Sequence, residues 1–83
     1  MIEEIGDPID VVAAFTGGKI LPILFSWRNR RYSNLKVANS WNTYEEGDAK
    51  LHHITVTNDS PNLYELCLNT RNFTWSLIKV YHE

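Results

Sequence analysis

Apolar and polar residues alternate along the chain in short runs, and residues typical of turns separate these runs. No window repeats apolar residues at the spacing of an amphipathic helix, whereas strand-like runs of Val, Ile, Leu, Thr and aromatics recur. We expect strands at 8–15, 20–28, 31–38, 50–57, 63–69 and 73–81. The pattern predicts a single all-β domain over residues 1–83, with about six antiparallel strands curled into a small barrel or barrel-like sandwich.

The first expected hairpin turns at Gly17–Gly18 and admits two registers. A two-residue turn places Ile9 and Phe25 on opposite faces of the sheet, because side chains alternate along a strand. A three-residue loop starting at Thr16 pairs Ile9 with Phe25 on one face, and such loops are common when a Gly takes the left-handed position. We therefore favour the longer loop, in which Pro22 faces outward at an edge or a bulge.

The second expected hairpin lies in the stretch FSWRNRRYSNL, with residues 29–30 as the central turn residues. This register sets Trp27 across from Tyr32, a favourable aromatic pair. It also sets Arg28 across from Arg31, and like charges directly opposite each other are unfavourable. An arginine in the second turn position adds conformational strain. The strain suggests that the turn has a use beyond reversing the chain.

Two later strands do not alternate cleanly, so we expect bulges near residues 34–35 and 77–78, of the kind that a closing sheet needs. The larger apolar side chains then face one interior. The predicted core consists of Ile9, Val11, Ile23, Phe25, Trp27, Tyr32, Leu66, Trp75 and Leu77.

Composition fits one folded domain, with 43% hydrophobic and 22% charged residues among 83. A lone cysteine, Cys67, excludes an internal disulfide and fits a reducing compartment. The N-terminus is acidic where a secretory signal is basic, and no apolar run is long enough to cross a membrane. We expect a cytoplasmic protein. The net charge of −2 gives no general attraction to nucleic acid, and the only basic cluster is the arginine stretch at 28–31.

Several short motifs resemble a family of uncharacterised small all-β bacterial domains. They are GDPIDV at 6–11, PILFSWRNRRY at 22–32, Trp41, YEL at 64–66 and WSLIKVY at 75–81. Members of that family occur as free-standing proteins or attached to lesion-bypass DNA polymerases. The resemblance covers nearly the whole chain, although the family usually has Gly at Asn29 and an apolar residue at Asn34. It implies no activity, and only by association does it imply work near nucleic acid.

The arginine stretch is the first candidate binding site. Arg28, Arg30 and Arg31 would contact phosphates while Trp27 and Tyr32 stack on bases, as in small β-barrels that bind single strands. The alternative is a solvated hairpin tip whose two aromatic rings belong to the core. Without a stacking surface, nucleic-acid contact through the arginines would be weak and sensitive to salt.

The second candidate site is the polar segment NSWNTYEEGD, which we expect to be a loop. Trp41 either anchors this loop over one end of the barrel or is exposed for binding, and Tyr44 admits both interpretations. With the acidic residues 45–48 on its rim, this segment or an edge strand would suit contact with another protein.

The sequence indicates no catalytic or metal site and no cofactor. The adjacent histidines 52–53 would point to opposite faces of a strand and so cannot bind one ion together. Asp7, Asp10 and Glu65 have no base or nucleophile coupled to them, and Cys67 has the setting of a small strand hydrophobe. We therefore predict a non-catalytic accessory or binding module, with no evident small-molecule substrate and no membrane partner.

Overall fold

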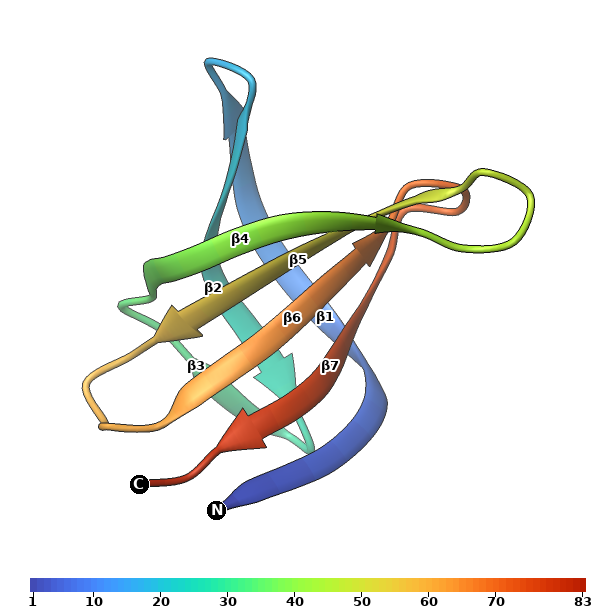
Figure 1. Ribbon diagram of the computed structural model, residues 1–83. Helices are drawn as coiled ribbons and strands as arrows, with labels where there is room; N and C mark the ends of the chain where they lie inside the picture. Colours follow the sequence, from blue (N-terminus) through green and yellow to red (C-terminus); the bar gives the residue numbers. More distant parts are fainter.

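The computed structural model describes residues 1–83 and contains strands but no helix. The strands are β1 (Ile2–Thr16), β2 (Lys19–Trp27), β3 (Arg30–Tyr32), β4 (Lys36–Tyr44), β5 (Lys50–Thr57), β6 (Leu63–Asn69) and β7 (Thr74–Tyr81). They form one antiparallel sheet in the order β3-β2-β1-β7-β6-β5-β4 (Figure 1). The prediction of an all-β fold is confirmed, and the sheet has seven strands where about six were expected.

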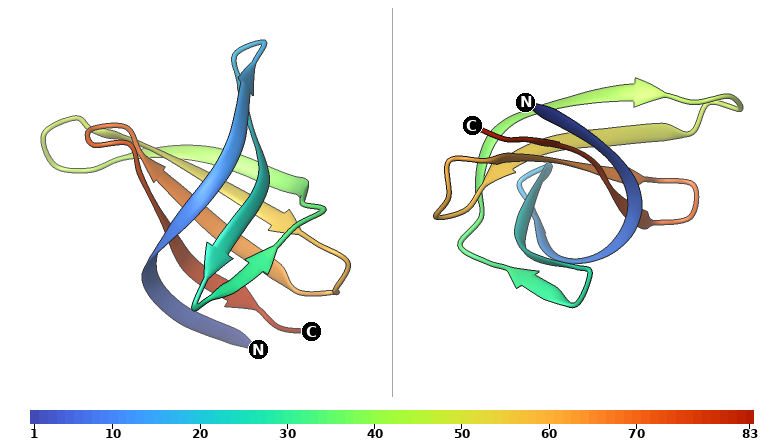
Figure 2. Two further views of the ribbon diagram at one scale, coloured as in Figure 1. Left: turned by 180° about the vertical axis from the view of Figure 1, so that it is seen from behind. Right: turned by 90° about the horizontal axis from the view of Figure 1, so that it is seen from below.

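The sheet curls on itself without closing. The view from below shows β1 sweeping round in an arc, so that β2 and β3 come to lie across from β5 and β6 (Figure 2). β2 contacts β4, yet β3 and β4 remain unpaired edges of the sheet. The result is barrel-like, and both edges remain available to another strand.

The curl depends on bulges within the pairings of β7 with β1 and with β6. Register shifts between Glu4 and Asp7, and Gly6 between them has a φ of 74°, which glycine adopts without strain. A second bulge lies in β7. Leu66 of β6 pairs with Leu77, whereas Glu65 pairs with Lys79, so Ile78 is the extra residue. The predicted bulge at 77–78 is confirmed. Such bulges increase local twist and bend the strands.

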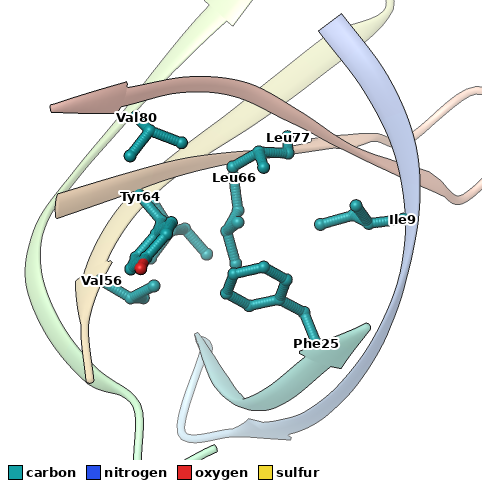
Figure 3. Packing of buried hydrophobic residues seen from close by; sticks show 8 residues of the cluster. Ile9, Phe25, Val56, Tyr64, Leu66, Leu77 and Val80 are labelled. Atoms are coloured by element: carbon teal, nitrogen blue, oxygen red, sulfur yellow. The ribbon is translucent and has the colours of Figure 1, made fainter. Parts of the chain in front are cut away.

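The core fills the concave side of the sheet, where eight residues form one buried cluster (Figure 3). Its members are Ile9, Phe25, Ile54, Val56, Tyr64, Leu66, Leu77 and Val80. Four further residues of the predicted core, Val11, Trp27, Tyr32 and Trp75, are half-buried and pack against it. The remaining one, Ile23, was predicted wrongly, because it is exposed.

The first hairpin has the two-residue turn, so the predicted three-residue loop is wrong. Thr16 pairs with Lys19 around Gly17–Gly18, and a bulge in β2 opposite Val12 and Ala13 then leaves Ile23 without a partner. Beyond the bulge Val11 pairs with Phe25, so the expected apolar residues do share the core face. An extra residue in the strand changes the parity just as an extra loop residue would. The predicted outward orientation of Pro22 is also wrong, since Pro22 is buried.

The second hairpin turns one residue earlier than predicted. Its central residues are Arg28 and Asn29, with φ values of 52° and 63°, and Trp27 pairs with Arg30. Two positive φ values make this a type I′ turn, whose twist matches that of paired strands. Arg31 pairs with Ser26, so the predicted opposition of Arg28 and Arg31 does not occur.

Aromatic packing accounts for this register. It sets Phe25 across from Tyr32, and their rings stack with centroids 4.7 Å apart and planes inclined by 8°. Both rings also contact Tyr64, with centroid distances of 5.5 and 5.4 Å. Three packed aromatic rings stabilise the hairpin more than the Trp27–Tyr32 pair alone would. Their packing offsets the cost of the positive φ of Arg28.

The segment after β3 differs most from the prediction. The expected strand 31–38 is interrupted at residues 33–35, where Asn34 has a φ of 55°, so the chain leaves the sheet instead of forming a bulge. Strand β4 then runs to Tyr44 and includes Trp41, which places both aromatics in a strand and not in the predicted loop. The connection to β5 consists only of residues 45–49.

Candidate functional site

The side chain of Arg28 contacts two other residues of the protein, Asp7 and Trp27. The indole Nε1 of Trp27 donates a hydrogen bond of 2.8 Å to Oδ2 of Asp7, and Nη2 of Arg28 lies 3.3 Å from the same oxygen. The Arg28 guanidinium also lies over the Trp27 ring, with Cζ 4.5 Å from the centroid, a distance typical of a cation–π contact. Asp7 therefore joins the bend of β1 to the turn of the second hairpin, and Arg28 has a structural role.

Arg30 and Arg31 lie on opposite faces of β3. Arg30 shares the face of Trp27 and Tyr32, and its Cζ is 5.8 Å from the Tyr32 ring centroid. Arg31 pairs with Ser26 on the other face. Both are exposed, and the ion pairs of the protein involve neither of them. The three arginines therefore do not form one anion-binding patch, because one is paired and the others point apart.

The aromatic rings beside the arginines already have partners. Tyr32 is stacked on Phe25, and Arg28 covers a face of Trp27. Both Trp27 and Tyr32 are half-buried against the core. These contacts leave little ring surface for stacking bases in an extended single strand.

Strand β4 is the second candidate and is exposed along its whole length. The ring of Trp41 stacks on that of His53, with centroids 5.2 Å apart and planes inclined by 3°, and 38% of the residue remains exposed. Tyr44 is 68% exposed. Neither aromatic is buried over a barrel end, so the structure favours the exposed alternative for both.

A polar cluster lies on the convex face, next to β4. Glu65 is buried there, accepts a hydrogen bond of 3.1 Å from the Tyr81 hydroxyl, and lies 3.4 Å from Nδ1 of His53. Nε2 of His53 is hydrogen-bonded to Thr43 at 2.8 Å. No sequence motif predicts the pairing between His53 and Glu65, because it depends on the register of two strands, β5 and β6.

The electrostatics of this cluster do not favour a nucleophile. Burial raises the pKa of the Cys67 thiol, and the negative charge of Glu65 raises it further. Burial likewise raises the pKa of Tyr81, together with its hydrogen bond to Glu65. A thiol or phenol that stays protonated is a poor nucleophile. As predicted, His52 and His53 point to opposite faces, since His52 contacts Asn42 instead. No group of three or more potential ligands could hold a metal ion.

A hollow that the sequence did not predict lies at the hairpin end of the sheet. It has a volume of about 410 Å³ and lies between the second hairpin, the β5–β6 loop and the C-terminus. We call it the Tyr64 pocket. It is lined by Trp27, Arg30, Tyr32, Asn58, Ser60, Asn62, Tyr64, Val80 and His82. These residues come from segments that are distant in sequence, so no local motif predicts the pocket.

Comparison of the chain with protein-family models, with curated proteins and with solved structures gives no match. The resemblance to the bacterial domain family therefore stays a prediction. The structure has no helix that could serve as a membrane span.

Proposed function

We propose that this chain is a non-catalytic binding module whose main contact surface is strand β4. The carrying observation is that nine consecutive edge residues are exposed and that Lys36, at the first position, is their only charge. Edge strands expose unpaired backbone N–H and C=O groups, and proteins usually block them with charges or proline. A bulge at Ala38 disturbs only the beginning of β4. Residues 39–44 offer a regular, uncharged edge for the addition of another strand.

A second copy of the chain suits this edge on grounds of charge. An antiparallel pair of β4 strands related by a twofold axis and centred on Trp41 places the two Trp41 residues opposite each other. The same register brings Lys36 of each copy to Glu45 and Glu46 of the other, and opposite charges across strands are favourable. No like charges face each other in this arrangement. The expected product is a weak homodimer with a continuous sheet, because one strand pair covers little area.

Sedimentation velocity over a range of protein concentrations tests this proposal. The wild type should show a monomer–dimer equilibrium, and Trp41→Lys should be monomeric because it sets two lysines opposite each other. Phe73→Lys is the matched control, since Phe73 is also an exposed aromatic but lies in the β6–β7 turn. A wild type that remains monomeric at millimolar concentration, or equal dimerisation by both variants, would contradict the proposal.

A second candidate function is weak contact with single-stranded nucleic acid through the second hairpin. What supports it is that Arg30 and Arg31 are exposed and have no acidic partner. Two phosphate contacts on a single strand give a slope of log K against log salt of about −1.4. Titration of labelled single-stranded DNA at two salt concentrations tests it, and the absence of binding at low salt would refute it.

We also propose that the module works in the cytoplasm. The lone thiol of Cys67 supports this location, because it is buried in the reduced form and has no cysteine to pair with.

A further inference from the structure

The Tyr64 pocket has walls suited to a flat ring. Trp27, Tyr32 and Tyr64 line it, with ring centroids 6.2 Å apart for the first two and 5.4 Å apart for the last two. The ring planes are inclined to one another by 38° and 55°. The volume of about 410 Å³ is in the range of pockets for small molecules. Because these rings pack on one another and Tyr64 is only 5% exposed, a ligand ring in the hollow would contact their outer edges and would not stack between them.

The polar groups around these rings are almost all free donors. Tyr64 is only 5% exposed and its hydroxyl has no hydrogen-bond partner in the protein, while Figure 3 shows the oxygen pointing away from β6. The Oδ1 atoms of Asn58 and Asn62 accept backbone hydrogen bonds, as does Oγ of Ser60. Their remaining capacity lies in the two Nδ2 groups and the serine hydroxyl hydrogen. These donors have no partner within the protein and are free to bind a ligand rich in acceptors.

The charges around the pocket point to the same ligand. Arg30 lines the pocket, is exposed and has no ion-pair partner. His82 also lines it, with Nε2 held 2.8 Å from Glu3, and the nearby Asp59 accepts a hydrogen bond from Asn34. No carboxylate lines the pocket. An anion inside the pocket would therefore meet one free guanidinium, while the nearby carboxylates of Glu3 and Asp59 are bound to His82 and Asn34.

We propose that the Tyr64 pocket binds a pyrimidine nucleotide of the uracil or thymine type. The planar ring occupies the hollow beside Trp27 and Tyr64 without stacking between them, its carbonyl oxygens accept from the amide and hydroxyl donors, and its phosphate contacts Arg30. This site is separate from β4, which forms the other edge of the sheet. The ligand is either a free nucleotide or one residue of a single strand, since both present the same ring and phosphate.

Titration of the labelled protein with uridine 5′-monophosphate, followed by heteronuclear NMR, tests the assignment. We expect shifts of the Trp27 indole and of residues 58–64, with saturation. Arg30→Gln should weaken binding about tenfold, the loss of one charge-assisted contact. Arg31→Gln is the matched control and should bind as the wild type does, because Arg31 lies on the opposite face of β3. Uridine without phosphate should bind about as weakly as the Arg30 variant.

Two further titrations separate the ring contacts from general charge attraction. Tyr64→Phe keeps the packed ring but removes the donor, so it should fold normally and bind the nucleotide less tightly. A short thymidine oligonucleotide that binds much more tightly than the mononucleotide, with the same dependence on Arg30, would identify a single strand as the source. Inorganic phosphate alone should not shift the Trp27 indole.

Three results would overturn the assignment. One is the absence of shifts at millimolar nucleotide and oligonucleotide. The second is an equal loss of binding in Arg30→Gln and Arg31→Gln, which would indicate contact with the whole hairpin tip. The third is unchanged binding by both Arg30→Gln and Tyr64→Phe. Trp41→Lys should bind the nucleotide normally, so failure of the β4 proposal and failure of this one can be told apart.

Discussion

Replacement of Asp7 by alanine should destabilise the fold more than its partial exposure suggests. The change removes the acceptor of the Trp27 indole, and a hydrogen bond to a charged group contributes about 1.5–3 kcal/mol. It also removes the partner of Arg28, whose side chain is 63% exposed, so this ion pair adds at most about 1 kcal/mol. We expect a total loss of about 2–3 kcal/mol in the free energy of unfolding.

Urea denaturation followed by tryptophan fluorescence and circular dichroism measures this loss. Asp10→Ala is the matched control, because Asp10 is an exposed carboxylate in the same strand, β1, and has no hydrogen bond or ion pair. Asp7→Asn keeps an oxygen acceptor for the indole and should lose only about 1 kcal/mol. If Asp7→Ala were no less stable than Asp10→Ala, the link between the β1 bend and the hairpin would not stabilise the fold.

Four more outcomes are expected. Leu66→Ala should lower the free energy of unfolding by about 2–5 kcal/mol in urea denaturation, since Leu66 is fully buried. A smaller loss would show that neighbouring side chains fill the cavity. Gly47→Ala should cost about 1 kcal/mol, because Gly47 has a φ of +86° and an added Cβ would lie 2.5 Å from Nη2 of Arg71; an unchanged melting temperature would contradict this. Cys67 should react slowly with a thiol reagent in the native state, because the thiol is buried and its pKa is raised; rapid stoichiometric labelling would be inconsistent with that. Burial lowers the pKa of His52 in the folded protein, and the positive charges of Lys50 and His53 lower it further. The neutral imidazole therefore contributes stability above pH 6.5, and this stability is lost as the pH falls below 6.5. His52→Gln should lose less stability over that pH range, and identical profiles of unfolding free energy against pH for the variant and the wild type would refute the argument.

Alternation along the chain was enough to predict the all-β fold and the bulge at Ile78, because burial on one face constrains parity strongly. Parity alone does not locate an extra residue. In the first hairpin, an extra residue in the loop would bring Val11 and Phe25 to the same face, and so would a bulge at Ile23. The structure has the bulge at Ile23. In the second hairpin, the packing of Tyr32 against Phe25 and Tyr64 decided the turn position.

The candidate sites were predicted less well for a related physical reason. Strand β4 is polar and exposed on an edge, so it lacks the alternation that reveals a strand, and Trp41 was assigned to a loop. Residues 28–31 are the only basic cluster, as the sequence predicts, but no local motif predicts that Asp7 binds Arg28, because the two residues are 21 positions apart. The Tyr64 pocket joins three segments, 27–32, 58–64 and 80–82, that lie at least sixteen residues apart, and only the register of the sheet brings them together.

Amide hydrogen exchange of β4, measured at low and high protein concentration, tests the central claim about this strand most directly. If β4 pairs with a second copy, amides in residues 39–44 should become more protected as the concentration rises, while those of the other edge, β3, do not change. Trp41→Lys should abolish the concentration dependence. Protection of β4 that is the same at both concentrations would contradict the account.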